Sequence, residues 1–257
     1  MLRFSLLGSG SQGNAVLVSS GKTKILIDNG LSFKQLRLRA AEIGESLERI
    51  EALFVTHEHR DHVAGLGILT RKMDIPVFMT ERTRDSLPAS IGPVKGITCI
   101  EAGEAISVDG MTISSFSISH DAADPVSYVV ESEGVKLGLA ADLGHPSNVV
   151  RTRLMGCHGL ILESNYCPDM LRRSAYPPAI QQRIRGRQGH LSNSAMCSLL
   201  AGLLHEALRH VVLVHISEEN NQHQLALDMA RQVIRELPIE VCVALQNQPT
   251  PLFELRL

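Results

Sequence analysis

The segment Thr56–His62, a run of histidines with one aspartate, most constrains what this chain can fold into. It follows the apolar run Ile50–Val55, which is rich in β-branched and aromatic residues and has the usual strand length of about 5–6 residues. The residues after it, Val63–Leu69, have helical spacing. The segment therefore lies where a buried strand ends and a helix begins, and extended backbone points His57 and His59 to the same side.

Four side chains of the kinds that bind metal ions fall within this segment: His57, His59, Asp61 and His62. Such a set suits two adjacent ions better than one, because a single catalytic zinc ion normally takes three protein ligands and keeps one position open. A run of solvated histidines ahead of a helix is the alternative interpretation. Because chance rarely produces His-x-His-x-Asp-His at the end of a strand, we expect a metal site here.

Size and composition describe an ordinary globular protein. The chain has 257 residues, 44% hydrophobic and 20% charged, and a net charge of −2, so any site for a polyanion must be local. Its five cysteines are scattered and form no Cys-x-x-Cys pair, which fits a reducing cytoplasm and argues against a disulfide framework. We find neither a secretory signal nor an apolar run of about 20 residues, and expect a cytoplasmic protein without membrane association.

Strand-like and helix-like segments alternate along the whole chain, and no linker rich in Pro, Gly and Ser divides it. We expect one domain, residues 1–257, of the α/β class, most simply two sheets with helices outside. One predicted helix begins at Ser192 or Asn193 as its N-cap and continues to about Leu208.

Three further residues of ligand type, His120, Asp142 and His215, each follow a predicted strand. In layered α/β folds such loops gather at one edge, where ligands bind. The economical assignment divides seven side chains between two ions: His57, His59 and His120 on the first, Asp61, His62 and His215 on the second, and Asp142 bridging the two. Imidazole and carboxylate ligands without thiolate suit Zn²⁺, Mn²⁺ or Fe²⁺ and do not distinguish among them.

This set of residues resembles the metallo-β-lactamase superfamily. Five further motifs resemble its YycJ/WalJ-type branch, bacterial cytoplasmic proteins described as exonucleases or phosphodiesterases. They are Gly8–Asn14, Ile118–Pro125, Leu162–Asn165, Gly189–Asn193 and His215–Asn221. The resemblance spans nearly the whole chain and implies an αββα four-layer sandwich, a dinuclear metal site and a hydrolase.

Phosphodiester hydrolysis is the chemistry that such a pair of ions supports. Two metals about 3.5–4 Å apart hold a bridging hydroxide as nucleophile and stabilise charge on the phosphoryl oxygens. Asp61 is counted among the catalytic residues as well as among the ligands. His190 is the candidate that protonates the leaving oxygen, because related phosphodiesterases use a histidine about this far before the last ligand; a capping or supporting role is the alternative.

A local excess of arginine suits a nucleic-acid substrate. Residues 170–205 contain no Asp or Glu but hold five arginines, although a solvated basic helix would show the same pattern. Tyr166 and Tyr176 add candidates for base stacking. The candidate substrate contacts are these: Ser9, Ser11, Asn14, Asn165, Arg183, Arg185, Arg187, Ser192, Asn193, Ser217 and Asn220.

The leading hypothesis is a metal-dependent exonuclease acting on single- or double-stranded DNA, with RNA as a second class of substrate. A small-molecule (cyclic) phosphodiesterase or thioester hydrolase is one alternative, and a regulatory binding protein stabilised by a metal is another. The sequence leaves the oligomeric state open. Four other histidines are expected to lie away from the site: His158, His205, His210 and His223.

Overall fold

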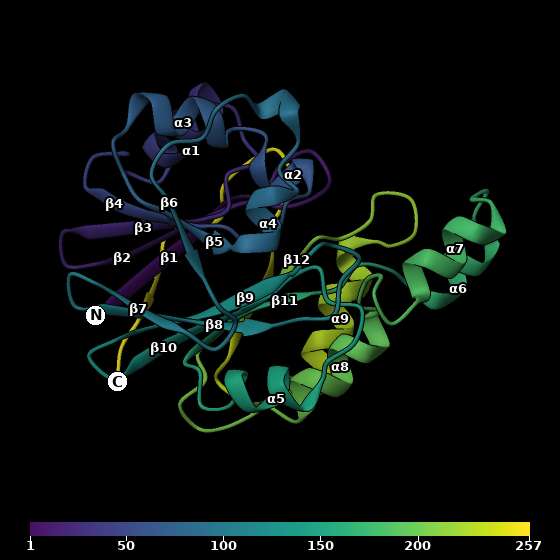
Figure 1. Ribbon diagram of the computed structural model, residues 1–257. Coiled ribbons are helices and arrows are strands. Elements are labelled where there is room, and N and C mark those ends of the chain that lie inside the picture. Colours follow the sequence, from purple (N-terminus) through teal and green to yellow (C-terminus); the bar gives the residue numbers. More distant parts are fainter.

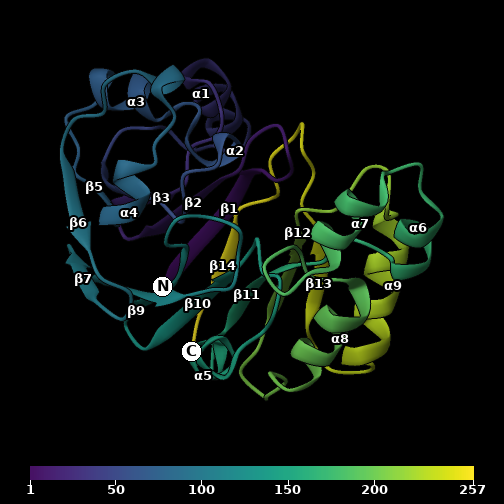
Figure 2. The same ribbon diagram turned by 45° about the vertical axis from the view of Figure 1, so that its right-hand side comes forward.

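The computed structural model describes residues 1–257 and contains two seven-stranded sheets that face each other (Figures 1 and 2). The first sheet has this spatial order: β14 (Phe253–Leu255), β1 (Leu2–Gly8), β2 (Ala15–Ser20), β3 (Thr23–Ile27), β4 (Ile50–Phe54), β5 (Val77–Thr80) and β6 (Ile97–Ile100). The second has this order: β13 (Glu240–Val243), β12 (His210–Val214), β11 (Gly159–Glu163), β10 (Val135–Ala140), β9 (Val126–Ser132), β8 (Met111–Ser117) and β7 (Ala105–Val108).

The two sheets are built to the same plan. In the first, β14, β1, β2 and β3 pair antiparallel, and β4, β5 and β6 continue from β3 as parallel strands. In the second, β7 to β10 pair antiparallel, and β11, β12 and β13 continue from β10 as parallel strands. Each half therefore presents the carboxyl ends of parallel strands at one edge, where loops that carry ligand-binding residues are usually found.

Helices cover the outer faces of both sheets (Figure 1). On the first sheet they are α1 (Phe33–Glu42), α2 (Arg60–Val63), α3 (Leu66–Lys72) and α4 (Glu81–Asp85), with the 3₁₀ turn η1 (Ala89–Ile91). On the second sheet they are α5 (Asn148–Leu154), α8 (Asn193–Ala201) and α9 (His223–Ile234). Two short helices, α6 (Pro168–Arg173) and α7 (Pro178–Arg185), project from this body.

Three apolar clusters fill the three interfaces between the four layers. The cluster between the sheets contains 24 buried residues, and the clusters beneath the outer helices contain 17 on the first sheet and 24 on the second. Phe54 and Tyr128 meet edge to face across the middle interface with ring centroids 5.5 Å apart. The Tyr128 hydroxyl donates a hydrogen bond to the carbonyl of Val55 at 2.7 Å, which ties the second sheet to the strand end that precedes the histidine segment.

The predicted α/β fold of two sheets with helices outside is confirmed, and so is Ser192 as the N-cap of α8, since its hydroxyl accepts a hydrogen bond from Ala195 N. The predicted end of that helix near Leu208 is wrong. Helix α8 stops at Ala201, because Gly202, a residue that disfavours helix by about 1 kcal/mol relative to alanine, forms its C-cap. None of the helices has the length and apolar character needed to cross a bilayer.

Candidate metal centre

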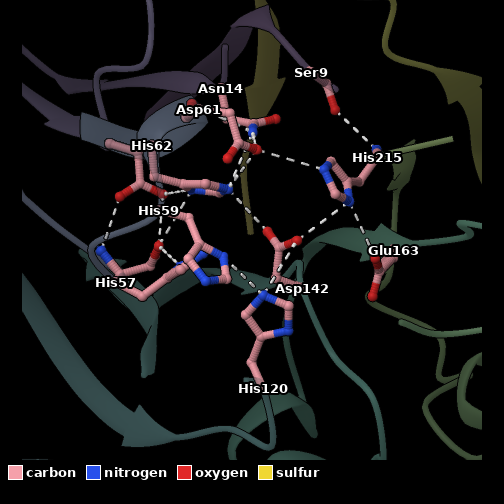
Figure 3. A network of polar contacts seen from close by, with 12 residues as sticks. Ser9, Asn14, His57, His59, Asp61, His62, His120, Asp142, Glu163 and His215 are labelled. Atoms are coloured by element: carbon pink, nitrogen blue, oxygen red, sulfur yellow. Dashed lines mark hydrogen bonds and ion pairs between the residues drawn. The ribbon is translucent and has the colours of Figure 1, made fainter. Parts of the chain in front are cut away.

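The seven predicted ligands meet at the edge where the strands of both sheets end. The loop after β4 carries His57 and His59, and α2 follows it directly with Asp61 and His62. The other three ligands follow β8, β10 and β12 of the second sheet: His120, Asp142 and His215. In Figure 3 these side chains converge on one space, with the Asp142 carboxylate near its middle.

His57, His59 and His120 form a compact group. One ring nitrogen of each lies within 4.8 Å of the others, and His120 Nε2 is 3.3 Å from His59 Nδ1. His57 is fully buried and His120 is 3% exposed, so little water competes for these nitrogens. Three imidazoles in this arrangement suit one cation.

Asp61, His62 and His215 meet on the other side of Asp142. Asp61 Oδ2 lies 3.3 Å from His62 Nε2 and 3.6 Å from His215 Nε2. Asp142 contacts both groups, since its Oδ2 is 3.0 Å from His62 Nε2 and its Oδ1 is 3.2 Å from His215 Nδ1 and 4.0 Å from His120 Nε2. Other groupings of these atoms also meet, such as His57, His62 and Asp142, so the geometry gathers the side chains without dividing them between two ions.

The residues fit divalent cations. His57 Nε2 and Asp142 Oδ2 are buried and make no hydrogen bond. His62 Nε2 lies close to that oxygen, but both atoms are of the kind that binds a metal ion. A buried polar atom without a partner is costly unless something else binds it, and a cation at this position would bind both atoms. The donors are imidazole nitrogens and carboxylate oxygens, which suit the ions expected from the sequence.

The electrostatics keep two of these ligands, Asp142 and His57, in the forms that bind cations. Burial opposes ionisation of Asp142, but nearby His215 and His62 outweigh it and hold the pKa of this carboxyl well below its ordinary value. Burial, and after it the neighbouring His62, lower the pKa of His57 well below the usual range. An ionised carboxylate and a neutral imidazole both have lone pairs free for a metal ion.

A buried aspartate that the sequence interpretation missed orients one of the ligands. Asp28 follows β3, and its Oδ2 accepts a hydrogen bond from His62 Nδ1 at 2.7 Å, which directs His62 Nε2 to the centre. Its two oxygens also accept hydrogen bonds from the backbone N–H and the hydroxyl of Thr56, both at 2.8 Å. Asp28 could have been found by the rule that identified Asp142 and His215, because all three come directly after an apolar strand.

Glu163, at the end of β11, is the second missed residue and holds His190 beside the centre. This carboxylate is fully buried, and its Oε2 accepts hydrogen bonds from Leu143 N at 2.7 Å and Leu191 N at 3.0 Å. Its Oε1 accepts from His190 Nδ1 at 2.7 Å and lies 3.2 Å from His215 Nδ1. Burial would lower the pKa of His190, but the Glu163 carboxylate outweighs it and raises that pKa above its usual value.

A cavity of about 280 Å³ opens beside His190 and His215. Four of the predicted substrate contacts line it: Ser9, Ser11, Asn165 and Ser217. His223 also lines it, so the expectation that this histidine lies away from the site is wrong: α9 begins at the cavity wall.

Three other predicted substrate contacts have structural partners instead. Asn14 donates to Asp61 Oδ2 at 2.9 Å and lies 3.0 Å from His62 Nε2, and Ser192 caps α8. Asn193 is fully buried and bonds to Ser164 and Asn221, so its predicted substrate contact is wrong. Asn220 is 1% exposed, and its side-chain amide makes no hydrogen bond, so its predicted substrate contact stays a prediction.

The three predicted arginines do not share one surface. Arg183 and Arg187 line a cavity of about 710 Å³ on one side of α7, where Arg183 Nε donates to Asp121 Oδ2. Arg185 lines a separate cavity of about 250 Å³ with Tyr166 and Arg172. The predicted basic surface is therefore split by the helix that carries it.

Comparison with known proteins places this geometry in a family. A family model described as the beta-lactamase superfamily domain matches residues 23–216. The exodeoxyribonuclease YycJ of Bacillus anthracis is 34% identical over 237 residues, covering 91% of this chain and 90% of that protein. The exodeoxyribonuclease WalJ of Streptococcus pneumoniae is 32% identical over 228 residues, covering 87% of this chain and 85% of that protein.

A solved structure shows the same fold. The metallo-beta-lactamase fold protein YhfI from Bacillus subtilis superposes with a TM-score of 0.72 over 97% of this chain and 98% of that one, at 14% identity. The family model covers residues 23–216, and the two nucleases cover most of the chain at identities above the level at which fold alone is shared. The chain therefore belongs to the metallo-β-lactamase superfamily and, within it, to the branch that contains YycJ and WalJ.

Proposed function

We propose that this chain is a metal-dependent hydrolase of phosphodiester bonds and that it digests DNA from an end. The observation that carries the proposal is the convergence of seven ligand-type side chains beside His190 and a cavity. The relatives that share about a third of its residues over most of its length are named exodeoxyribonucleases, which supports DNA as the substrate.

In this proposal two divalent ions bind at the centre, with Zn²⁺ or Mn²⁺ as the leading candidates and Fe²⁺ as the third. His57, His59 and His120 would hold one ion, the group around Asp61 would hold the other, and Asp142 lies beside both groups. Such a pair supplies Lewis-acid stabilisation of phosphoryl charge and lowers the pKa of water to about 7.

The chain's own residues supply position and protons. Asp61 is placed to orient an attacking water, because Asn14 and His62 fix one of its oxygens. His190 donates through Nδ1 to Glu163, and its other ring nitrogen is free to protonate the oxygen that leaves. Glu163 supports this role by favouring the protonated imidazole.

The test is a time course with DNA strands labelled at one end, single- and double-stranded, with RNA alongside. The protein is first treated with a chelator, and Zn²⁺, Mn²⁺ or Fe²⁺ is then restored. We expect cleavage only with metal, no cleavage by His57→Ala, and faster turnover of DNA than of RNA. Absence of cleavage with every ion would refute the proposal.

A second candidate function is the hydrolysis of a small phosphodiester, which the modest volume of the cavity, about 280 Å³, favours. Competition by DNA for turnover of a small substrate distinguishes the two functions. If excess DNA suppresses the turnover of bis(p-nitrophenyl) phosphate, the result supports the nuclease. If excess DNA leaves that turnover unchanged, the result supports the small substrate.

We also propose a cytoplasmic location. All five cysteines are free thiols in the structure, as expected of a protein in a reducing compartment.

A further inference from the structure

Three neighbouring cavities form a path past the metal centre. The cavity of about 280 Å³ beside His190 shares Tyr176, Ile184 and His190 with a second cavity of about 240 Å³. This second cavity shares Asp121, Arg183 and Gly189 with the cavity of about 710 Å³ along α7. The three cavities therefore follow one another along α7.

The first cavity, which we call the end cavity, is small. Its volume of about 280 Å³ lies at the lower limit for pockets that hold small molecules, about 300–1,000 Å³. This volume is of the size that one nucleoside needs. The ring of Tyr176 forms part of its wall, and an aromatic ring is a surface on which any base can stack.

Charge differs between the two ends of the path. Glu218 and Glu219 line the end cavity, which has no lysine or arginine in its wall, and the other titratable groups of the wall are Tyr176, His190, His215 and His223. At the other end, Arg183 and Arg187 line the cavity along α7, with Asp121 as the single carboxylate. A phosphate group is disfavoured beside the two glutamates and favoured beside the two arginines.

From this geometry we infer that the end cavity receives the last nucleoside of a strand whose end carries a hydroxyl group rather than a phosphate, while the rest of the strand leaves along the arginine side of α7. The inference rests on the proposed nuclease function and deepens it. It predicts mononucleotide products, since one nucleoside lies beyond the scissile phosphate. It also predicts that a terminal phosphate slows digestion from the end that the enzyme uses.

The experiment uses four versions of one internally labelled DNA strand, with hydroxyl or phosphate at the 5′ end and at the 3′ end. The metal-loaded protein is given each version, and the rate and the length of the released products are measured. We expect mononucleotides, and about tenfold faster release when the attacked end carries a hydroxyl. The end that responds identifies the polarity of digestion.

The variant Glu218→Gln/Glu219→Gln should bring the hydroxyl-to-phosphate rate ratio close to one. The matched control Glu48→Gln/Glu51→Gln changes net charge equally at exposed residues before and within β4 and should keep the wild-type ratio. Three results would overturn the inference: equal digestion of both kinds of end, a rate ratio that the Glu218→Gln/Glu219→Gln variant leaves unchanged, or products of several nucleotides.

Failure of the proposed function gives a different result. If none of the four strands is cleaved, the nuclease assignment fails, and fluorescence anisotropy with the same four strands then tests the end cavity alone. Tighter binding of hydroxyl-ended strands supports the inference, and equal or weaker binding of them refutes it.

Discussion

Strained backbone marks the residues that shape the centre. Asp28, Asp142 and His215 follow β3, β10 and β12, and all three have positive φ angles, of 60°, 52° and 54°. A non-glycine residue in this left-handed region costs of order 1–3 kcal/mol and persists where its surroundings fix it. Here the turn directs each side chain from the end of its strand toward the same space, which explains why three separate strands deliver ligand-binding groups to one point.

Asp28 should govern metal affinity without touching the metal. In Asp28→Asn, the acceptor that orients His62 through Nδ1 is weakened, so we expect metal affinity to fall by about 10- to 100-fold. Competition against a chromophoric chelator measures the affinity, and Asp74→Asn, at an exposed position, is the matched control. Unchanged affinity in Asp28→Asn would show that His62 is held by other contacts.

Glu163 should set the alkaline limb of the activity profile. A general acid must be protonated, so activity falls as pH rises through the pKa of His190, which the Glu163 carboxylate raises. Replacing that carboxylate in Glu163→Gln lowers this pKa, and the loss of activity should begin at lower pH.

Rate measurements between pH 6 and 10 check this shift. His190→Ala should lose about 10²- to 10⁴-fold in kcat and lack this limb. The double variant Glu163→Gln/His190→Ala should lack this limb as His190→Ala does, because the limb belongs to the His190 ring. An alkaline limb that stays in place in Glu163→Gln would contradict the role of His190 as the acid.

At the scale of elements, the sequence predicted well what is local or repeated. Four ligands are contiguous, and the rule of a ligand after a strand found Asp142 and His215. The same rule applied to β3 and β11 would have found Asp28 and Glu163. Asp28 was missed because an isolated carboxylate carries no motif of its own, whereas Glu163 lies within the motif Leu162–Asn165, which by itself does not show the role of each residue. What could not be predicted depends on tertiary contacts: the three-residue strand β14 exists through its pairing with β1.

Helix α7 shows why the arginines were grouped wrongly. The segment between β11 and α8 was not assigned helices of its own, although prolines at the first turns of α6 and α7 are a typical signal of a helix start. Helix α7 ends at Arg185, and Arg187 lies in the turn that follows it. Arg187 lines the same cavity as Arg183, whereas Arg185, two residues along the helix from Arg183, faces elsewhere. The cavities on the two sides of α7 follow this division.

The two sides of α7 should differ in DNA binding. Arg183→Gln/Arg187→Gln removes two cations from the strand path and should weaken binding and reduce the slope of log K against log salt by about 0.7–0.9 for each lost phosphate contact. Arg172→Gln/Arg185→Gln makes the same charge change on the other side and should have the smaller effect on both. Binding isotherms at several salt concentrations measure the slope, and equal effects of the two variants would place the strand elsewhere.

At the scale of the whole molecule, the centre joins two halves that are otherwise held together by an apolar interface. The first sheet contributes His57, His59, Asp61 and His62, and the second contributes His120, Asp142 and His215. Bound cations would therefore cross-link the loops of one sheet to those of the other. The same buried carboxylates and imidazoles lack full hydrogen bonding among themselves, so removal of cations leaves costly groups in place.

Metal removal should therefore destabilise the entire fold. A ligand at about 1,000 times its Kd adds about 4 kcal/mol to the free energy of unfolding, and for a chain of this size each kcal/mol corresponds to roughly 2–4 °C in Tm. We expect chelation to lower Tm by about 10 °C, with recovery when metal is restored, in thermal melts followed by circular dichroism. His57→Ala/Asp142→Ala should melt at a temperature that the chelator leaves unchanged, because the variant lacks one of the three clustered imidazoles and the carboxylate that contacts both groups of ligands. A wild-type Tm that is the same with and without metal would mean that the ions act in catalysis alone and that the apolar interface suffices to hold the two halves together.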